Sequence, residues 1–180
     1  MRNLVVLLVL IAAYTGNAQT SKPGGFTLSQ IDSIALKNGR SGIAEGIITS
    51  EKSVIREDKK LVIQGEGQSS VAIYLYKTPA FSRLIKGEYH RNVRYEDKSA
   101  EEVYAQFYYN EKQLYFIRLT EIINNGKEST TRSHDIDVTK METLKNSDFL
   151  FTPNIQKWIA QHDAEILKLS KAAQKDKDGN

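Results

Sequence analysis

The chain has 180 residues, with 25 lysines and arginines against 22 aspartates and glutamates, and it contains no cysteine. This length is sufficient for one domain with an ordinary hydrophobic core, and the lack of cysteine excludes disulfides, thiol nucleophiles and thiolate metal sites. The charges are mixed along the chain rather than gathered into the basic stripe typical of nucleic-acid-binding proteins, so we expect no nucleic-acid partner.

The first twenty residues have the layout of an export signal. Arg2 gives a positive start, the uncharged segment "LVVLLVLIAAY" follows, and small residues lead to Ala18. The apolar segment is shorter than the roughly 20 residues that a membrane-spanning helix needs. The pattern therefore predicts a signal peptide over residues 1–18, with an uncleaved anchor as the alternative. We expect a periplasmic or secreted protein of bacterial type, with no membrane span in the mature chain.

The first predicted element of the mature chain is a short helix. Thr27 and Gln30 match a capping box, in which two side chains satisfy free amide groups at the start of a helix. From Leu28 onward, apolar residues recur on one helical face. Asn38-Gly39 is a favourable end, because glycine accepts the left-handed conformation. We expect this helix to close an end or an edge of the core.

The segment over residues 43–64 is ambiguous. Gly42 and Gly46 disfavour a stable helix around "IAEGIIT". Residues 53–64, "SVIREDKKLVIQ", have apolar pairs on both sides of a charged patch, which is typical of a hairpin. A strand followed by a hairpin is the preferred interpretation, and a helix is left open.

Strand-forming segments alternate with short turns from Val71 to Val138. Asn125-Gly126 is the strongest of the turn signals. We expect five consecutive strands here, a run that favours an antiparallel meander. A helix beginning at Ser99 is the alternative for one of them, since "SAEE" is a capping-box pattern, but the density of aromatic and branched residues after it favours a strand.

The C-terminal part is predicted to contain an amphipathic helix. After Pro153, apolar residues recur at three- and four-residue steps around Trp158, which indicates a helix of about 18 residues. The segment "DFLF" at Asp148 is a candidate for one further strand. The predicted fold is therefore α+β: an antiparallel β-meander of five to seven strands, packed on the C-terminal amphipathic helix, with a short N-terminal helix.

The expected organisation is a single domain over residues 27–170. A flexible lead over residues 19–26 precedes it, and residues 171–180 are expected to form a disordered charged tail.

Alternation of side chains along a strand sorts the segment "VYAQFYYNEKQLYFIRLT" onto two faces. A three-residue connection over residues 110–112 keeps Gln106 and Arg118 off the aliphatic face, where burial without partners would be costly. The aliphatic face then carries Val103, Ala105, Phe107, Tyr109, Tyr115, Ile117 and Leu119. The other face carries Tyr104, Gln106, Tyr108, Leu114, Phe116, Arg118 and Thr120.

The tyrosines suggest a contact surface on the second face. Of the nine tyrosines, all but Tyr14 lie between Tyr74 and Tyr115. Tyrosine is common at binding sites because it joins an apolar ring to a polar tip, although it is also frequent on strands for structural reasons alone. The candidate binding residues are Tyr74, Tyr76, His90, Arg94, Tyr104, Tyr108 and Arg118. If this face is exposed, replacing Tyr104, Tyr108 and Arg118 together with alanine should leave the melting temperature nearly unchanged.

The sequence offers little material for catalysis. It has three histidines, and it lacks the short motifs of serine hydrolases, zinc proteases and phosphate-binding loops. His134 and Asp135 are the best metal candidates, but adjacent residues of a strand point to opposite faces. We therefore expect no metal, no cofactor and no catalytic residue.

The leading hypothesis is an exported, non-enzymatic protein that binds an unidentified polypeptide or glycan through the tyrosine- and arginine-bearing face. The first alternative is a carrier of an apolar small molecule, which requires a cavity between sheet and helix. The second is a hydrolase of an envelope polymer, which requires two carboxylates about 5–10 Å apart in a cleft.

Overall fold

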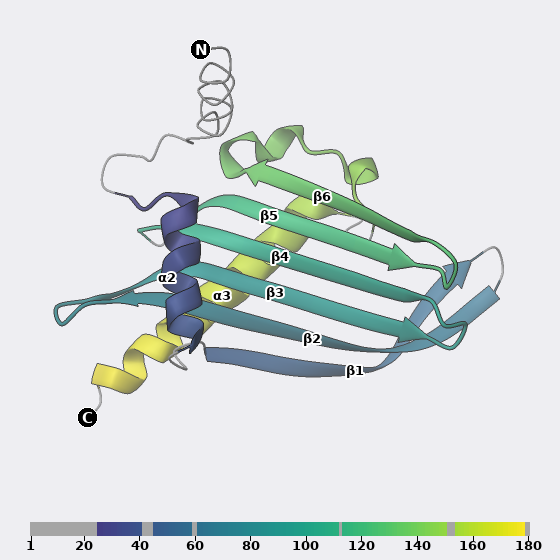
Figure 1. Cartoon of the computed structure of the whole chain (residues 1–180), viewed down its shortest axis with the longest axis horizontal. Coiled ribbons are helices and arrows are strands. Elements are labelled where there is room, and N and C mark those ends of the chain that lie inside the picture. Colours follow the sequence, from purple (N-terminus) through teal and green to yellow (C-terminus); the bar gives the residue numbers. More distant parts are fainter. Residues whose placement is uncertain (1–24, 41–44, 59–60, 112, 151–153, 179–180) are drawn as a thin grey trace, which may run out of the picture.

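The computed structural model describes residues 25–40, 45–58, 61–111, 113–150 and 154–178; the predicted signal peptide and its cleavage point lie outside these residues. One antiparallel sheet of six strands, in the order β1 to β6, lies between two helices (Figure 1). The short N-terminal helix α2 crosses one face and the long C-terminal helix α3 crosses the other. This confirms the predicted α+β meander.

Each strand pairs with the next one along the chain. The strands are β1 (Glu45–Asp58), β2 (Leu61–Lys77), β3 (Ser82–Tyr95), β4 (Ala100–Asn110), β5 (Gln113–Asn124) and β6 (Ser129–Asp137). The helices are α2 (Leu28–Arg40) and α3 (Ile155–Asp178), and two 3-10 turns, η1 (Val138–Thr143) and η2 (Asn146–Asp148), precede α3. Over its described residues, the ambiguous segment 43–64 thus supplies β1 and the start of β2, and the segment after Ser99 is a strand.

The C-terminal region differs from the expectation in two respects. The segment "DFLF" does not form a strand over its described residues: Asp148 ends η2, and Phe149 packs into the core. Helix α3 continues to Asp178, through most of the segment that was predicted to be a disordered tail over residues 171–180. Ala173 explains the greater length, because its buried methyl group extends the apolar side of the helix.

The main core lies between α3 and the sheet. Its buried side chains include Val103, Phe107, Ile117 and Leu119 from the strands and Ile155, Ile159 and Ile166 from the helix. Trp158 stacks on Phe107 with 6.1 Å between ring centroids, so α3 covers the aliphatic face as predicted. At Gly87 the helix meets the sheet directly, because a Cβ there would lie 2.6 Å from Cδ1 of Ile166.

A second, smaller core lies on the opposite face, beneath α2. Ile31 of α2 packs there against Ile85, Tyr108 and Phe116 of the sheet, and all four side chains are buried. The expectation that the N-terminal helix closes an end or an edge of the core is therefore wrong. The helix lies across a face of the sheet, because that face carries apolar groups which need a cover.

A bulge between β2 and β3 determines the position of Ile85. Tyr74 pairs with Lys86 and Leu75 with Leu84, so Ile85 is an extra residue on β3. The alternation is displaced at this point. Leu84 consequently faces α3 and Ile85 faces α2, the reverse of what simple alternation predicts.

A second bulge preserves most of the predicted sorting in β4 and β5. Asn110 pairs with Gln113, so the connection is shorter than the three residues expected. The extra residue Tyr115 compensates, since Tyr108 pairs with Phe116 and odd positions again face odd positions. Only Leu114 and Tyr115 exchange faces: Leu114 packs on the α3 side and Tyr115 on the α2 side.

Candidate functional site

The seven candidate residues lie on the face of the sheet that α2 crosses, here called the α2 face. The helix divides this face into a covered part and an open part (Figure 1). Tyr74, Tyr76 and Tyr108 belong to the covered part, where they pack in the second core. His90 and Arg94 belong to the open part, where they line a hollow. The fold therefore does not unite the seven residues in one site.

A polar network joins α2 to the covered part of the sheet. Lys86 Nζ lies 2.8 Å from Asp32 Oδ1 on α2 and 2.9 Å from Glu88 Oε1 on the same strand. The hydroxyl of Tyr108 donates to Asp32 Oδ1 at 3.0 Å. Lys86 is only 4% exposed and Tyr108 is 0% exposed. The expectation that Tyr108 faces water is thus wrong, because α2 and its aspartate cover the ring and its hydroxyl.

Glu88 is the centre of the tyrosine contacts on this face. It accepts hydrogen bonds from the hydroxyl of Tyr74 at 2.8 Å, the hydroxyl of Tyr104 at 2.9 Å and the amide of Gln106 at 3.2 Å. Burial acts to raise the pKa of Glu88, but the hydrogen bond and charge of Lys86, together with the hydrogen bonds from Tyr74 and Tyr104, outweigh burial and lower it. Burial, together with the ionised Glu88, raises the pKa of both phenols. The carboxylate therefore stays charged and the tyrosines stay neutral.

The remaining two candidates also have partners within the protein. The ring of Tyr76 packs edge-on against Phe26, with 5.0 Å between centroids. Arg118 donates from Nε to Asp135 Oδ1 at 3.2 Å and lies 3.9 Å from Asp32. These side chains act in the packing of α2 and of the sheet surface beside it.

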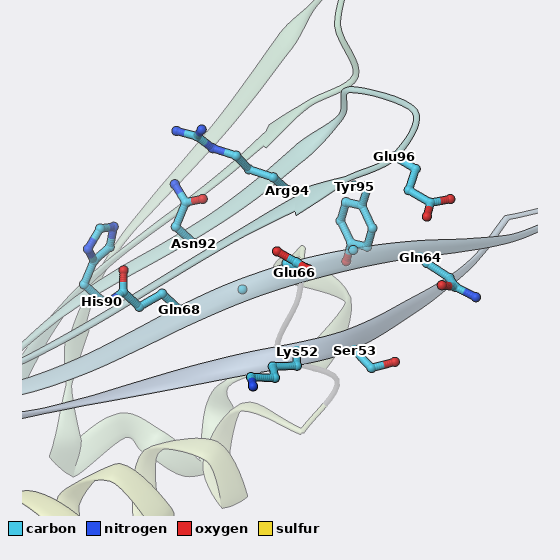
Figure 2. Close-up of a pocket in the computed structure, with 12 residues that line it drawn as sticks. Lys52, Ser53, Gln64, Glu66, Gln68, His90, Asn92, Arg94, Tyr95 and Glu96 are labelled. Carbon is cyan, nitrogen blue, oxygen red and sulfur yellow. The ribbon is translucent and has the colours of Figure 1, made fainter.

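The open part of the α2 face contains a hollow of about 700 Å³ (Figure 2). Its side chains come from β1, β2, β3 and the turn that follows, and most of them are polar. The labelled residues in Figure 2 are Lys52, Ser53, Gln64, Glu66, Gln68, His90, Asn92, Arg94, Tyr95 and Glu96. Sequence analysis named only two of them, His90 and Arg94.

The hollow forms where the paired ends of β1 and β2 bend away from the direction of the other strands (Figure 1). The register of β1 against β2 shifts between Glu51 and Val54, which marks a bulge at the bend. Gly65 on β2 permits close pairing with β3, because a Cβ there would lie 2.6 Å from Cδ1 of Tyr95 and 2.8 Å from the carbonyl oxygen of Arg94. A larger residue at position 65 would push the two strands apart.

The polar side chains of the hollow differ from those under α2 in their partners. The side chains of Gln64, Gln68, Asn92 and Arg94 have no hydrogen-bond partner among the described residues. His90, in contrast, has a partner: its Nε2 lies 2.7 Å from Glu102 Oε1, at the border with the tyrosine network. Groups with unused donors and acceptors are free to bind water or a ligand.

The metal candidates at His134 and Asp135 point in opposite directions. The ring of His134 packs against Phe149 on the α3 side, with 4.5 Å between centroids, whereas Asp135 contacts Arg118 on the α2 face. Across the described residues, no group of three or more metal-ligating side chains is close enough to hold an ion. None of the helices in this part of the chain is both long and apolar enough to cross a membrane.

Comparison with known proteins does not indicate a family or a function for this chain. No protein-family model, curated protein or solved structure matches the chain.

The amides of the hollow were missed in sequence analysis, although alternation from His90 indicates that Asn92 and Arg94 share its face. The opposing Gln64 and Gln68 were not identifiable, because the register between β2 and β3 is not evident from either strand alone.

Proposed function

We propose that this protein is an exported, non-enzymatic binding protein that holds a hydroxyl-rich glycan chain in the hollow between β1, β2 and β3. One observation carries the proposal. The polar network of Lys86, Asp32 and Tyr108 under α2 is internally paired, whereas the side chains of Gln64, Gln68, Asn92 and Arg94 lack partners among the described residues. The function thus belongs to the open part of the α2 face rather than to its tyrosines.

The chemistry of the lining suits a polyhydroxylated ligand. Each carboxamide of Gln64, Gln68 and Asn92 offers both donors and an acceptor, as does each sugar hydroxyl. Lys52 and Arg94 add charged donors at either side of the hollow. A ligand that presents many hydroxyl groups would satisfy this mixture without burying an unpaired charge.

A glycan is favoured over a polypeptide by the lack of an apolar anchor in the hollow. Protein interfaces usually concentrate their binding energy on a few aromatic side chains seated in pockets. Tyr95 lines the hollow, but it is only 7% exposed, since its ring packs beside Gly65. The imidazole ring of His90 also lines the hollow, but its Nε2 is already paired with Glu102.

The two alternatives receive less support. A carrier needs empty space between α3 and the sheet, but Ile166 of the helix lies directly on Gly87 and buried side chains fill the layer around this contact. A carboxylate-dependent hydrolase needs one protonated carboxyl group. Glu88 does not suit that role, because its pKa is lowered in spite of burial.

The test is binding of the mature chain, Gln19 to Asn180, to an array of defined oligosaccharides, followed by calorimetry on each one retained. The triple variant Gln68→Ala, Asn92→Ala, Arg94→Ala should lose at least about tenfold in affinity, because three ligand hydrogen bonds are removed. Its melting temperature should stay unchanged, since these side chains have no described protein partner.

The matched control is Lys168→Ala, Lys171→Ala, at two exposed positions of α3 on the other side of the sheet. This variant should bind as the parent does. Equal affinity of the triple variant and the control would overturn the proposal. Retention of a polypeptide but no oligosaccharide at the hollow would replace the glycan by a protein partner.

A further inference from the structure

A second hollow lies on the other face of the sheet, between α3 and the strands β1 and β2. Its volume is about 240 Å³, and the side chains around it include Thr49 of β1, Ser69 of β2, Tyr89 of β3, and His162 and Glu165 of α3. The lining reaches the edge strand β1, whereas the filled core at the α3 contact with β3 lies further into the sheet. We call this space the α3 hollow.

His162 is an almost fully buried polar side chain of the α3 hollow. It is 7% exposed, and its ring lies 4.0 Å from that of Tyr89 and 4.5 Å from that of Trp158, measured between centroids. Its Nδ1 is buried without a hydrogen-bond partner, and Oε2 of Glu165 lies 3.4 Å away. Because buried polar groups normally have partners, this nitrogen points to a ligand that completes the site.

The protonation state of His162 decides what the ring offers to a ligand. Burial lowers its pKa against the opposing effect of Glu165, so the ring is uncharged at neutral pH. The single proton of a neutral imidazole is best placed on Nδ1, which is the nitrogen near the carboxylate. Nε2 then carries a lone pair, and no described residue donates a hydrogen bond to it. The ring therefore offers an acceptor.

The charged groups around the α3 hollow leave one negative charge without a counter-charge. Glu51 also lines the hollow, but Arg91 pairs with its carboxylate at 2.8 Å. Glu165 has no lysine or arginine partner in the described part of the chain, and its side chain is 40% exposed. A ligand with one positive charge would balance the site.

The size of the α3 hollow favours an organic ammonium ion over a metal ion. The volume corresponds to that of about eight water molecules, and no group of three or more metal-ligating side chains forms within the described ranges. An ammonium group combines a compact positive charge with several N–H donors. Thr49 and Gln161, whose side chains have no hydrogen-bond partner among the described residues, can bind a further polar group of the ligand.

We propose that the α3 hollow binds a small primary amine that carries a hydroxyl group, and that its ammonium group donates hydrogen bonds to the carboxylate of Glu165 and to Nε2 of His162. This site shares no residue with the hollow of the α2 face and lies on the other side of the sheet. The proposal therefore stands or fails independently of glycan binding.

The test is titration of the protein with ethanolamine at neutral pH, followed by nuclear magnetic resonance of the His162 ring. The ring signals should shift saturably, with a dissociation constant of about 1 mM for so small a ligand. Ethylene glycol lacks the charge and choline lacks N–H donors, so both should bind at least about tenfold more weakly. The rings of His90 and His134 lie outside the hollow and serve as internal references.

Glu165→Gln keeps the shape of the side chain and removes its charge, so it should weaken ethanolamine binding at least about tenfold. Glu128→Gln is the matched control, because it makes the same change of charge at an exposed position of a turn. The variant Gln68→Ala, Asn92→Ala, Arg94→Ala should bind ethanolamine as the parent does.

Three results would each overturn the proposal. The first is an unshifted His162 ring at saturating ethanolamine, and the second is equal binding of ethanolamine, choline and ethylene glycol. The third is an affinity of Glu165→Gln that equals that of Glu128→Gln.

Discussion

Tyr108 and Asp32, which are 76 positions apart in the chain, are joined by a hydrogen bond of 3.0 Å from the phenol hydroxyl to Oδ1. The bond connects β4 to α2, and Lys86 shares the same carboxylate oxygen. The tyrosines near α2 therefore contribute to stability, and the polar hollow farther along the sheet remains available for binding. The two parts of the α2 face should respond differently to mutation.

Replacement of Tyr104, Tyr108 and Arg118 by alanine should destabilise the protein strongly. Truncating a buried aromatic residue such as Tyr108 costs about 3–5 kcal/mol, and Tyr108→Phe should cost about 1 kcal/mol for the lost hydrogen bond. Urea denaturation measures both. The exposed Gln68→Ala is the control, with an expected change within about 0.5 kcal/mol. An unchanged midpoint for the triple variant would show that α2 does not cover Tyr108 in solution.

Stability should fall in acid partly through Glu88. Lys86, together with the hydrogen bonds from Tyr74 and Tyr104, holds the pKa of Glu88 below the unfolded value of about 4.5, despite the opposing effect of burial. The ionised carboxylate thus stabilises the fold above that pH, and the contribution is lost as the pH falls through the folded pKa. Urea midpoints of the parent and Glu88→Gln should differ more at pH 7 than in strong acid. A gap that is the same at both pH values would contradict the assignment.

Gly87→Ala should destabilise the protein by about 1–3 kcal/mol, because the new methyl group would overlap Ile166 of α3. The double variant Gly87→Ala, Ile166→Ala should lose less than the sum of the two single losses, since the smaller helix residue makes room. Thermal or urea denaturation of the parent, the two single variants and the double variant measures the coupling between the two positions as a double-mutant cycle. Additive losses would mean that α3 does not contact the sheet at this glycine.

Alkaline titration should show that few tyrosine hydroxyls ionise at the pH expected for a solvated phenol. Burial raises the pKa of Tyr89 and Tyr95 to about 12. The pKa of five further tyrosines is also raised, in each case with burial as the largest cause: Tyr74, Tyr104, Tyr108, Tyr109 and Tyr115. Tyrosinate absorbance should therefore rise together with loss of the circular-dichroism signal. Ionisation of most tyrosines near pH 10 in the folded protein would show instead that they are solvated.

Part of the candidate site was accessible from the sequence. Alternation along β3 correctly puts His90 and Arg94 on one face, and both line the hollow. The tyrosines were given a binding role because their preference for half-wet surfaces is a property of the residue type. Their actual partners, Asp32 and Glu88, come from α2 and from another position on the sheet, and no local pattern relates these residues.

The sequence by itself determined the strands between Val71 and Val138, the amphipathic helix around Trp158 and the start of α2, because alternation, helical periodicity and capping act between neighbours in the chain. The capping box is present: the amide of Thr27 donates to Gln30 Oε1 at 2.9 Å. Only the tertiary structure decided that α2 lies across the sheet and that Ile85 and Tyr115 are extra residues in bulges. Those outcomes depend on side chains far apart in sequence, whose mutual burial outweighs the local register.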